Sequence, residues 1–303
     1  MTPQNEKYPL LPDIRTAEGE LTECALLLEG GSLRNIYSAG VCDVLMEHGI
    51  HPGVIAGVSA GALCGWNMMA RQIGRFAHIG IYHRHDSRYA GLRAIASDGG
   101  LVGFRFLLET VEELYPCPAG MREEAGRRFV AVATDCKSGK PFYAERCVFT
   151  PFEKALQASS SLAFSSRMVH EQGKALMDGG YSVSVPLEWA QKEGIEKKIV
   201  VLSRPVTARK SPVSDAKRRA FAAAYSRYPS FLEAVNAVPE NYNRLREEIE
   251  RQSNAGELFL IAPKEDLPME KMEGNTDKLY LCYLMGRRDA LQALPQLKEY
   301  LQA

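Results

Sequence analysis

The chain has 303 residues, with 37 basic and 37 acidic side chains, so its formal net charge is zero. Hydrophobic residues make up 46% of the sequence, which is enough for a sizeable core and excludes a disordered or collagen-like protein. Because a basic excess is missing, we expect no nucleic-acid partner. No apolar run in the sequence approaches the ~20 residues that a membrane-spanning helix needs.

The cysteines and the N-terminus indicate a cytoplasmic protein. Seven cysteines, an odd number without a Cys-x-x-Cys pair, favour reduced and mostly buried thiols over a disulfide framework or a zinc site. Residues 1–22 lack the apolar stretch of a secretory signal and are predicted to form a loose tail. His83, His85 and Asp86 lie on a predicted exposed loop without an evident fourth ligand, so we expect no metal site and no cofactor.

Predicted strands and helices alternate along the chain. The predicted strands are 24–28, 54–56, 128–134, 141–144, 174–177, 198–202 and 257–261. The predicted helices are 36–48, 60–72, 107–114, 152–158, 187–193, 215–225, 242–252 and 277–286. This alternation is typical of α/β folds in which helices cover both faces of a mainly parallel central sheet. Residues 23–303 are expected to form one domain, helical with one strand after about residue 205.

A serine occupies the turn between the second predicted strand and its following helix. The pentapeptide Gly57-Val-Ser59-Ala-Gly61 matches the nucleophile elbow, in which a sharp strand-to-helix turn exposes a serine hydroxyl. Glycine at 57 and 61 suits a place where a Cβ would clash as the chain doubles back. Ser59 could equally serve as a helix cap, since the pentapeptide is common.

The sequence offers two kinds of base that could activate Ser59, a histidine and a carboxylate. An α/β-hydrolase triad places its histidine after the serine and the acid, and His170 is the last histidine of the chain. It could act with Asp98 or Asp135. The alternative is direct activation by a carboxylate, for which Asp178, followed by Gly179 and Gly180, is the candidate. Asp-Gly is also a common turn pair.

A second strand-to-helix loop is rich in glycine. Gly30, Gly31, Ser32 and Arg34 precede the first predicted helix, where backbone amides point outward and can bind an anion. The loop matches neither the dinucleotide fingerprint nor the P-loop. It therefore fits an oxyanion hole, in which one lost donor costs ~3–4 kcal/mol of transition-state stabilisation.

Together, the loop at 30–35, the pentapeptide at 57–61 and Asp178-Gly-Gly180 resemble the patatin-like phospholipase family of serine lipid acyl hydrolases. Two further blocks, at 133–143 and 158–164, are also similar to that family. The resemblance implies a three-layer α/β/α fold and a Ser59–Asp178 dyad without histidine. It also implies an oxyanion hole around Gly31 and Ser32 and an acyl-lipid substrate, with phospholipids as one class.

One departure from the family pattern lies in the oxyanion loop. Ser32 and Asn35 stand where the family usually has glycine, whereas Arg34 keeps the basic position. A serine still donates its amide but narrows the approach of a substrate oxygen, and asparagine tolerates left-handed backbone. We expect retained activity with a restricted substrate range. A catalytically silent member that binds lipid or protein is the alternative.

A basic segment follows the last part of the resemblance. Residues 204–228 contain one acid, Asp215, and seven basic residues: Arg204, Arg209, Lys210, Lys217, Arg218, Arg219 and Arg227. This segment is either a solvated helix face or a patch that contacts anionic lipid at the inner face of a membrane. Trp66, on the helix after Ser59, is expected in the core rather than in the wall of an acyl pocket.

Overall fold

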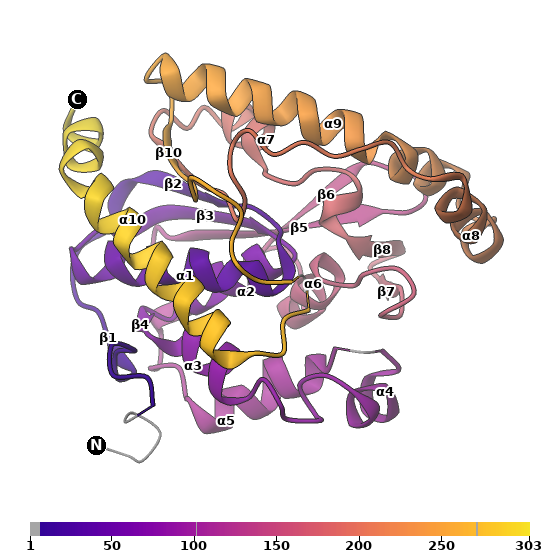
Figure 1. Cartoon of the computed structure of the whole chain (residues 1–303), viewed down its shortest axis with the longest axis horizontal. Helices are drawn as coiled ribbons and strands as arrows, with labels where there is room; N and C mark the ends of the chain where they lie inside the picture. Colours follow the sequence, from indigo (N-terminus) through magenta and orange to yellow (C-terminus); the bar gives the residue numbers. More distant parts are fainter. Residues whose placement is uncertain (1–6, 101, 271) are drawn as a thin grey trace.

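The computed structural model describes residues 7–100, 102–270 and 272–303. Within these ranges the main sheet has eight strands in the order β10-β9-β2-β3-β5-β8-β7, with β6 also paired to β5 (Figure 1). The bounds are β2 Thr22–Leu28, β3 Pro52–Val58, β5 Arg128–Asp135, β6 Pro141–Glu145, β7 Val169–Glu171, β8 Lys174–Asp178, β9 Lys198–Val201 and β10 Phe259–Ile261. Two short strands, β1 Arg15–Thr16 and β4 Gln72–Ile73, pair separately.

Helices connect most of these strands. Their bounds are α1 Asn35–Glu47, α2 Ala60–Met69, α3 Arg75–Tyr82, α4 Leu92–Asp98, α5 Val111–Leu114, α6 Phe152–Ser159, α7 Leu187–Lys192, α8 Asp215–Tyr225, α9 Pro229–Asn254 and α10 Thr276–Gln302. A π-helical turn, Phe106–Thr110, leads into α5. In the described ranges, no helix is long and apolar enough to span a bilayer.

The strands bury side chains on both faces, as expected for a sheet between two helix layers. Leu26 and Leu28 of β2 face one core with α1, α2 and α10, whereas Ala25 and Leu27 face the other with α7 and α9. Figure 1 shows α9 and α7 on one side of the sheet and α1, α2 and α10 on the other. The predicted three-layer α/β/α fold is confirmed.

The sheet is parallel in one half and antiparallel in the other. Strands β10, β9, β2, β3 and β5 run parallel to one another. Strands β6 and β8 pair with β5 antiparallel, and β7 pairs with β8 antiparallel. The sheet is therefore mainly parallel, as predicted, but the strand that leads into Asp178 is not one of the parallel strands.

The N-terminal segment differs from the loose tail that the sequence predicts. Residues 1–6 lie outside the described part, but from residue 7 onward the segment packs on the body. Tyr8 is buried and its ring lies 4.8 Å from that of Tyr280 on α10. Arg15–Thr16 forms strand β1. Aromatic burial at Tyr8 thus holds a stretch whose polar composition suggested none.

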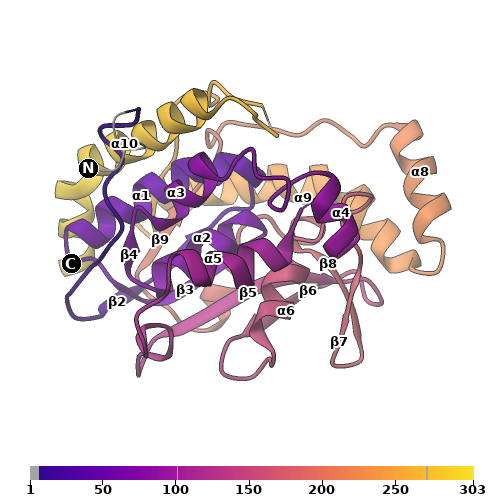
Figure 2. The ribbon, with the colours of Figure 1, turned by 90° about the horizontal axis from the view of Figure 1, so that it is seen from below.

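The C-terminal part is helical with one strand among the described residues, and its helices extend further than predicted. Helix α9 begins at Pro229 and continues through Pro239, and α10 continues through Pro295. Strand β10 joins the main sheet and α10 packs along α1. Because this part completes both the sheet and a helix layer, we infer that residues 23–303 form one domain. Helix α8 projects at the far end from the C-terminus (Figures 1 and 2).

Candidate active site

Ser59 stands at the tip of a strained turn between β3 and α2. Its backbone has φ 56° and ψ −129°, a conformation that L residues adopt rarely and that functional turns retain. A Cβ at Gly57 would lie 2.6 Å from the amide nitrogen of Ala62. A Cβ at Gly61 would lie 2.5 Å from the carbonyl oxygen of Glu29. Both glycines of the pentapeptide are therefore required by close backbone contacts.

A second serine holds this turn against the neighbouring strand. The Ser59 amide donates to Ser159 Oγ at 2.9 Å, and Ser159 Oγ donates to the Val132 carbonyl of β5 at 2.6 Å. Ser159 ends α6 and is fully buried. The sequence showed Ser159 only as part of a familiar block, and its positioning role could not be inferred there. It fixes the height of Ser59 above the sheet.

Register across β5 brings Asp178 level with Ser59. Val58 pairs with Val132, and the next residue of β5, Ala133, pairs with Asp178. Ser59 and Asp178 thus flank Ala133 from opposite sides. Asp178 is the last residue of β8, which is antiparallel to β5, and it lies beside Ala133 because β8 overlaps only the last residues of β5.

The backbone around Asp178 is fixed by several hydrogen bonds. The Asp178 amide donates to the Ser161 carbonyl at 2.9 Å, and Thr134 Oγ1 donates to the Asp178 carbonyl at 2.8 Å. The Gly180 amide donates to Asp178 Oδ1 at 2.8 Å. A Cβ at Gly179 would lie 2.2 Å from the Val132 carbonyl oxygen, so only glycine lets the chain cross the end of β5 there. The carboxyl group of Asp178 is buried, and the amide of Gly180 in the following turn fixes its orientation.

The Tyr181 hydroxyl lies within electrostatic range of Asp178. Burial raises the pKa of the Tyr181 hydroxyl, and the negative charge of Asp178 raises it further. Tyr181 Oη accepts a hydrogen bond from the Ala163 amide at 2.9 Å. The tyrosine thus remains a neutral hydroxyl beside the carboxylate.

The glycine-rich loop lies directly against Ser59. A Cβ at Gly30 would lie 3.2 Å from the Cβ of Ser59, and one at Gly31 would lie 2.3 Å from Ser203 Oγ. The amide of Gly30 donates to the Ser184 carbonyl, and that of Arg34 donates to the Gly31 carbonyl. These two amides are therefore occupied, which leaves the amides of Gly31 and Ser32, the pair that the resemblance implies, as the candidate donors.

The departures from the family pattern have different structural consequences. Ser32 adopts φ 55°, the left-handed conformation that favours glycine, and its hydroxyl points to Met272 Sδ at 3.7 Å. Asn35 is helical, with φ −67°, so the left-handed backbone that we expected it to tolerate does not occur there. Its buried side-chain amide instead donates to the Glu29 carbonyl at 2.8 Å. Asn35 therefore clamps the start of the loop.

Ser59 and Asp178 line one cavity of about 670 Å³ together with Gly30, Gly31, Ser32 and Arg34. The residues that the sequence predicts for the site thus meet in one place. The same cavity is lined by Arg204, Arg209, Lys210 and Lys217 of the basic segment, which we had expected to face solvent or a membrane. Sequence spacing could not reveal this, because these residues lie more than 140 positions after Ser59.

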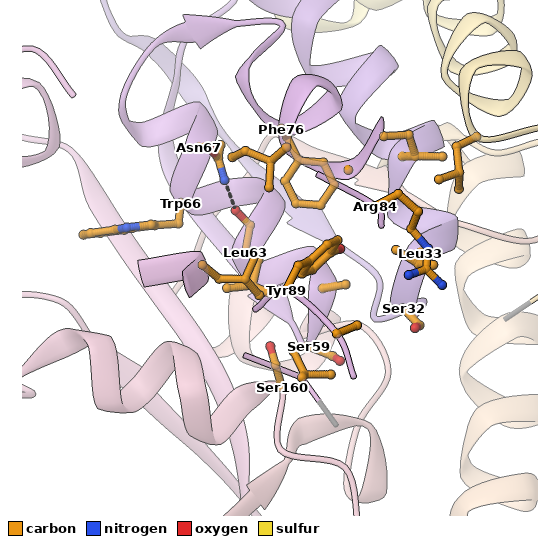
Figure 3. A pocket seen from close by; sticks show the side chains of 18 of the residues that line it. Ser32, Leu33, Ser59, Leu63, Trp66, Asn67, Phe76, Arg84, Tyr89 and Ser160 are labelled. Carbon is orange, nitrogen blue, oxygen red and sulfur yellow. Dashed lines mark hydrogen bonds between the residues drawn. The ribbon is translucent and has the colours of Figure 1, made fainter. Parts of the chain in front are cut away.

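A second, apolar cavity of about 110 Å³ opens on the other side of Ser59. Ser32, Ser59 and Leu162 line both cavities. Its walls include Leu33, Leu63, Phe76, Tyr89, Leu107 and Leu108. Figure 3 shows Ser59 and Ser160 at one edge, with Leu63, Phe76 and Tyr89 gathered beside them. Its size and composition suit a hydrocarbon chain.

Trp66 lies both in the core and in the wall of the apolar cavity, the two places that the sequence analysis considered for it. It lines the apolar cavity but is 9% exposed, and its ring lies 5.5 Å from that of Phe129 and 5.2 Å from that of Phe152. In Figure 3 its ring points away from the other labelled side chains. Most of Trp66 therefore belongs to the core, as expected.

His170 lies away from Ser59. It pairs with Ala175, three residues before Asp178 on β8, which at ~3.3 Å per residue is about 10 Å along the strand. Asp98 and Asp135 each accept hydrogen bonds from their own loops, from the Arg105 and Lys137 amides respectively. This geometry argues against a histidine triad.

The segment with His83 and Asp86 is engaged in other contacts. His83 Nε2 lies 2.8 Å from Tyr115 Oη, and Asp86 pairs with Arg88 at 2.7 Å. Within the described ranges, no group of three or more His, Cys, Asp or Glu side chains is placed to hold a metal ion. All seven cysteines are free thiols, five of them buried.

Comparison with known proteins identifies two regions of the chain. The sequence model of the patatin-like phospholipases matches residues 26–190, and a domain of unknown function, DUF6363, matches residues 228–302. The chain is 25% identical to the uncharacterized protein YjjU of Escherichia coli (strain K12), over 87% of this chain and 74% of that protein.

A solved structure, VipD from Legionella pneumophila, is similar to 94% of this chain and 70% of its own, with 15% identity and a TM-score of 0.47. The patatin-like match covers more than half of the 303 residues and spans the pentapeptide at 57–61, the glycine-rich loop and Asp178. The chain therefore belongs to the patatin-like phospholipase family.

Proposed function

We propose that this protein is a serine esterase that hydrolyses carboxylic esters of acyl lipids, phospholipids among them, through a Ser59–Asp178 dyad. Membership of a family of lipid acyl hydrolases supports the reaction class. The observation that carries the proposal is the meeting of Ser59, Asp178 and the glycine-rich loop in one cavity. A silent member would have no need of the strained backbone at Ser59.

The mechanism follows from these positions. Asp178 takes the proton of the Ser59 hydroxyl as Ser59 Oγ attacks the ester carbonyl. The amides of Gly31 and Ser32 stabilise the negative oxygen of the tetrahedral intermediate. The intermediate collapses to an acyl-enzyme, and the leaving alcohol receives the proton from Asp178. Asp178 then takes a proton from water as the water oxygen attacks the acyl-enzyme. Collapse of the second tetrahedral intermediate breaks the bond to Ser59 Oγ, which receives that proton from Asp178 as the fatty acid leaves.

A panel of p-nitrophenyl esters and phospholipids, assayed with wild type and variants, tests this proposal. Ser59→Ala should abolish turnover and labelling by a fluorophosphonate probe. Asp178→Asn should lower turnover at least ~10²-fold, whereas Asp135→Asn, the matched carboxylate at the end of β5, should not. Labelling of Ser59→Ala, or near-normal rates in Asp178→Asn, would remove the dyad.

The silent alternative rests on Ser32, whose Cβ stands beside the proposed oxyanion donors with a left-handed backbone. It predicts a folded protein that binds acyl lipid but neither turns it over nor reacts with the probe. The same panel therefore separates the two functions.

We also propose peripheral contact with anionic membranes, in keeping with a cytoplasmic location. Phe164 is 60% exposed and its ring lies 4.9 Å from that of Phe221 on α8, next to the exposed Arg218 and Arg219. An apolar ring beside basic side chains suits an anionic lipid surface. Arg218→Glu/Arg219→Glu should weaken sedimentation with phosphatidylglycerol vesicles; unchanged sedimentation would contradict the contact.

A further inference from the structure

One wall of the cavity that holds Ser59 is strongly basic. The name "basic wall" is used here for five side chains that line it: Arg34, Arg204, Arg209, Lys210 and Lys217. Two carboxylates, Glu29 and Asp178, line the same cavity. Glu29 is neutralised by a buried ion pair with Arg246. The cavity therefore has an excess of positive charge although the whole chain has none.

Two guanidinium groups of this wall lie close enough to repel each other. Burial lowers the pKa of Arg34, and the positive charge of Arg204 lowers it further. Asp266 and Glu29 oppose this effect. Like charges that face one cavity are stabilised when an anion enters between them.

Two other members, Lys210 and Arg209, are held in place by packing and backbone contacts. Lys210 Nζ lies 4.1 Å from the centre of the Tyr242 ring, and its backbone forms two hydrogen bonds with the Asn243 side chain. Arg209 donates to the Val206 carbonyl and lies 3.7 Å from Glu247. These contacts fix the positions of Lys210 and Arg209 in the wall.

The chemistry of the wall fits phosphate. Guanidinium groups present paired N–H donors that match phosphate oxygens, and lysine adds a compact positive charge. The hydroxyl-bearing Ser211 and Ser214 line the same cavity. A quaternary ammonium group would find no such match, because it would be repelled by the same charges.

The two cavities suit the two ends of an amphiphilic substrate. The apolar cavity and the basic one share Ser32, Ser59 and Leu162. An acyl chain in the first and an anionic group in the second would leave the joining ester at Ser59 Oγ. This arrangement needs only a short link between the ester and the anion, as in a glycerol phosphate.

We propose that the basic wall is a headgroup site that selects acyl esters carrying a net negative phosphate group over zwitterionic and neutral ones. This proposal rests on the proposed function. It also reassigns the basic segment: four of its seven basic residues line the reaction cavity rather than facing a membrane, namely Arg204, Arg209, Lys210 and Lys217.

Binding to Ser59→Ala tests the proposal without requiring turnover. The ligands are three monoacyl compounds with the same acyl chain, below their critical micelle concentrations so that no membrane surface is present. They are an acylglycerol phosphate, an acylglycerol phosphocholine and a plain monoacylglycerol. Calorimetry should show the phosphate compound binding at least ~10-fold tighter than the other two. Inorganic phosphate, in a parallel titration, should bind more weakly than the acylglycerol phosphate.

A double variant assigns this preference to the wall. Arg204→Gln/Lys210→Gln, in the Ser59→Ala background, should reduce the preference for the phosphate compound at least ~10-fold. Lys192→Gln/Arg251→Gln removes two exposed charges outside the cavity and should keep it. With wild-type Ser59, the ratio of kcat/KM values for the phosphate and phosphocholine compounds should follow the same pattern.

Each outcome bears on one of the two proposals. Equal affinity for the three lipids, or a preference that survives in the double variant, would overturn the headgroup site. Inorganic phosphate binding as tightly as the lipid would assign the wall to free phosphate and would overturn it as well. Selective binding without turnover or probe labelling would support the headgroup site while refuting the proposed esterase.

Discussion

A buried ion pair ties α9 to the glycine-rich loop beside Ser59, and its removal is the perturbation with the clearest expected effect. Glu29, the residue before Gly30, pairs with Arg246 of α9, and their side chains are 2% and 1% exposed. The Ser203 amide also donates to Glu29 Oε2 at 2.7 Å, and Arg246 donates to Tyr242 Oη at 2.6 Å. Arg246→Met keeps most of the apolar stem of the side chain but leaves the Glu29 carboxylate without its counter-charge.

The magnitude follows from burial. Removing one partner of a buried ion pair costs about 3–5 kcal/mol, because the other charge is left in the interior. With an unfolding entropy of about 2.1 cal/mol/K per residue, a chain of this size should lose roughly 5–8 °C in melting temperature. Because Glu29 also holds the start of the oxyanion loop, we expect kcat to fall more than KM rises.

A double-mutant cycle measures the coupling. Arg246→Met, Glu29→Gln and the double variant are unfolded in urea and followed by circular dichroism. The double variant should be more stable than the sum of the single losses predicts, by more than ~1 kcal/mol. Arg251→Met is the matched control, since Arg251 lies on the same helix but is 55% exposed, and should cost less than ~1 kcal/mol.

Additive losses within ~0.5 kcal/mol would refute this reasoning, since they would mean that the two side chains act independently. Equal losses for Arg246→Met and Arg251→Met would refute it as well, because burial would then not decide the cost.

Three further predictions concern the loop, the apolar cavity and a buried acid. Ser32→Gly should raise the free energy of unfolding by up to ~1 kcal/mol in urea titrations, because relief of the left-handed backbone (about 1–2 kcal/mol) outweighs the entropy cost of glycine. Gln172→Gly is the control: Gln172 has φ 48° but is remote from Ser59, so this variant should gain similar stability without altering esterase kinetics. A loss of stability at Ser32→Gly would contradict the strain. Leu63→Trp narrows the apolar cavity and should lower kcat/KM for a dodecanoyl ester at least ~10-fold relative to an acetyl ester, since displacing two methylenes of the acyl chain from the cavity loses about 1.6 kcal/mol. Equal effects on both esters would place the acyl chain elsewhere. Burial raises the pKa of Asp43 to about 7 despite its hydrogen bond from Tyr283 Oη, so the folded state binds this proton more tightly than the unfolded chain. The free energy of unfolding should therefore fall as pH rises from about 4 to 7. Asp43→Asn should flatten that part of the pH profile of the melting temperature, and an unchanged slope would exclude Asp43 as its source.

Local geometry explains why the fold and the position of Ser59 could be predicted from the sequence. Continuous apolar runs indicate strands buried on both faces. The glycine at 57 is dictated by contacts within the turn, whereas the glycine at 61 is dictated by the backbone of Glu29 on the neighbouring strand-to-helix loop. Helix α9 was predicted too short because Pro239 usually ends a helix, whereas here it lies inside one. Packing of the helix on the turn Gly179–Tyr181 and on strand β10 overrides that local preference.

Contacts between distant parts of the chain could not be predicted. The direction of β8, the pairing of Glu29 with Arg246 and the approach of Arg204 to Arg34 all depend on tertiary packing that no local spacing encodes. The basic segment therefore looked like a solvated or membrane-facing patch. Likewise, the sequence located a glycine-rich loop but not which of its amides are occupied by Ser184 and Gly31 carbonyls.

The measurement that tests the central claim most directly is intact-protein mass spectrometry after reaction with a fluorophosphonate probe, followed by peptide mapping. The account predicts one adduct on wild type, located at Ser59, its loss in Ser59→Ala, slow formation in Asp178→Asn and normal formation in His170→Ala. An adduct at another residue, or one that depends on His170 and not on Asp178, would contradict the Ser59–Asp178 dyad.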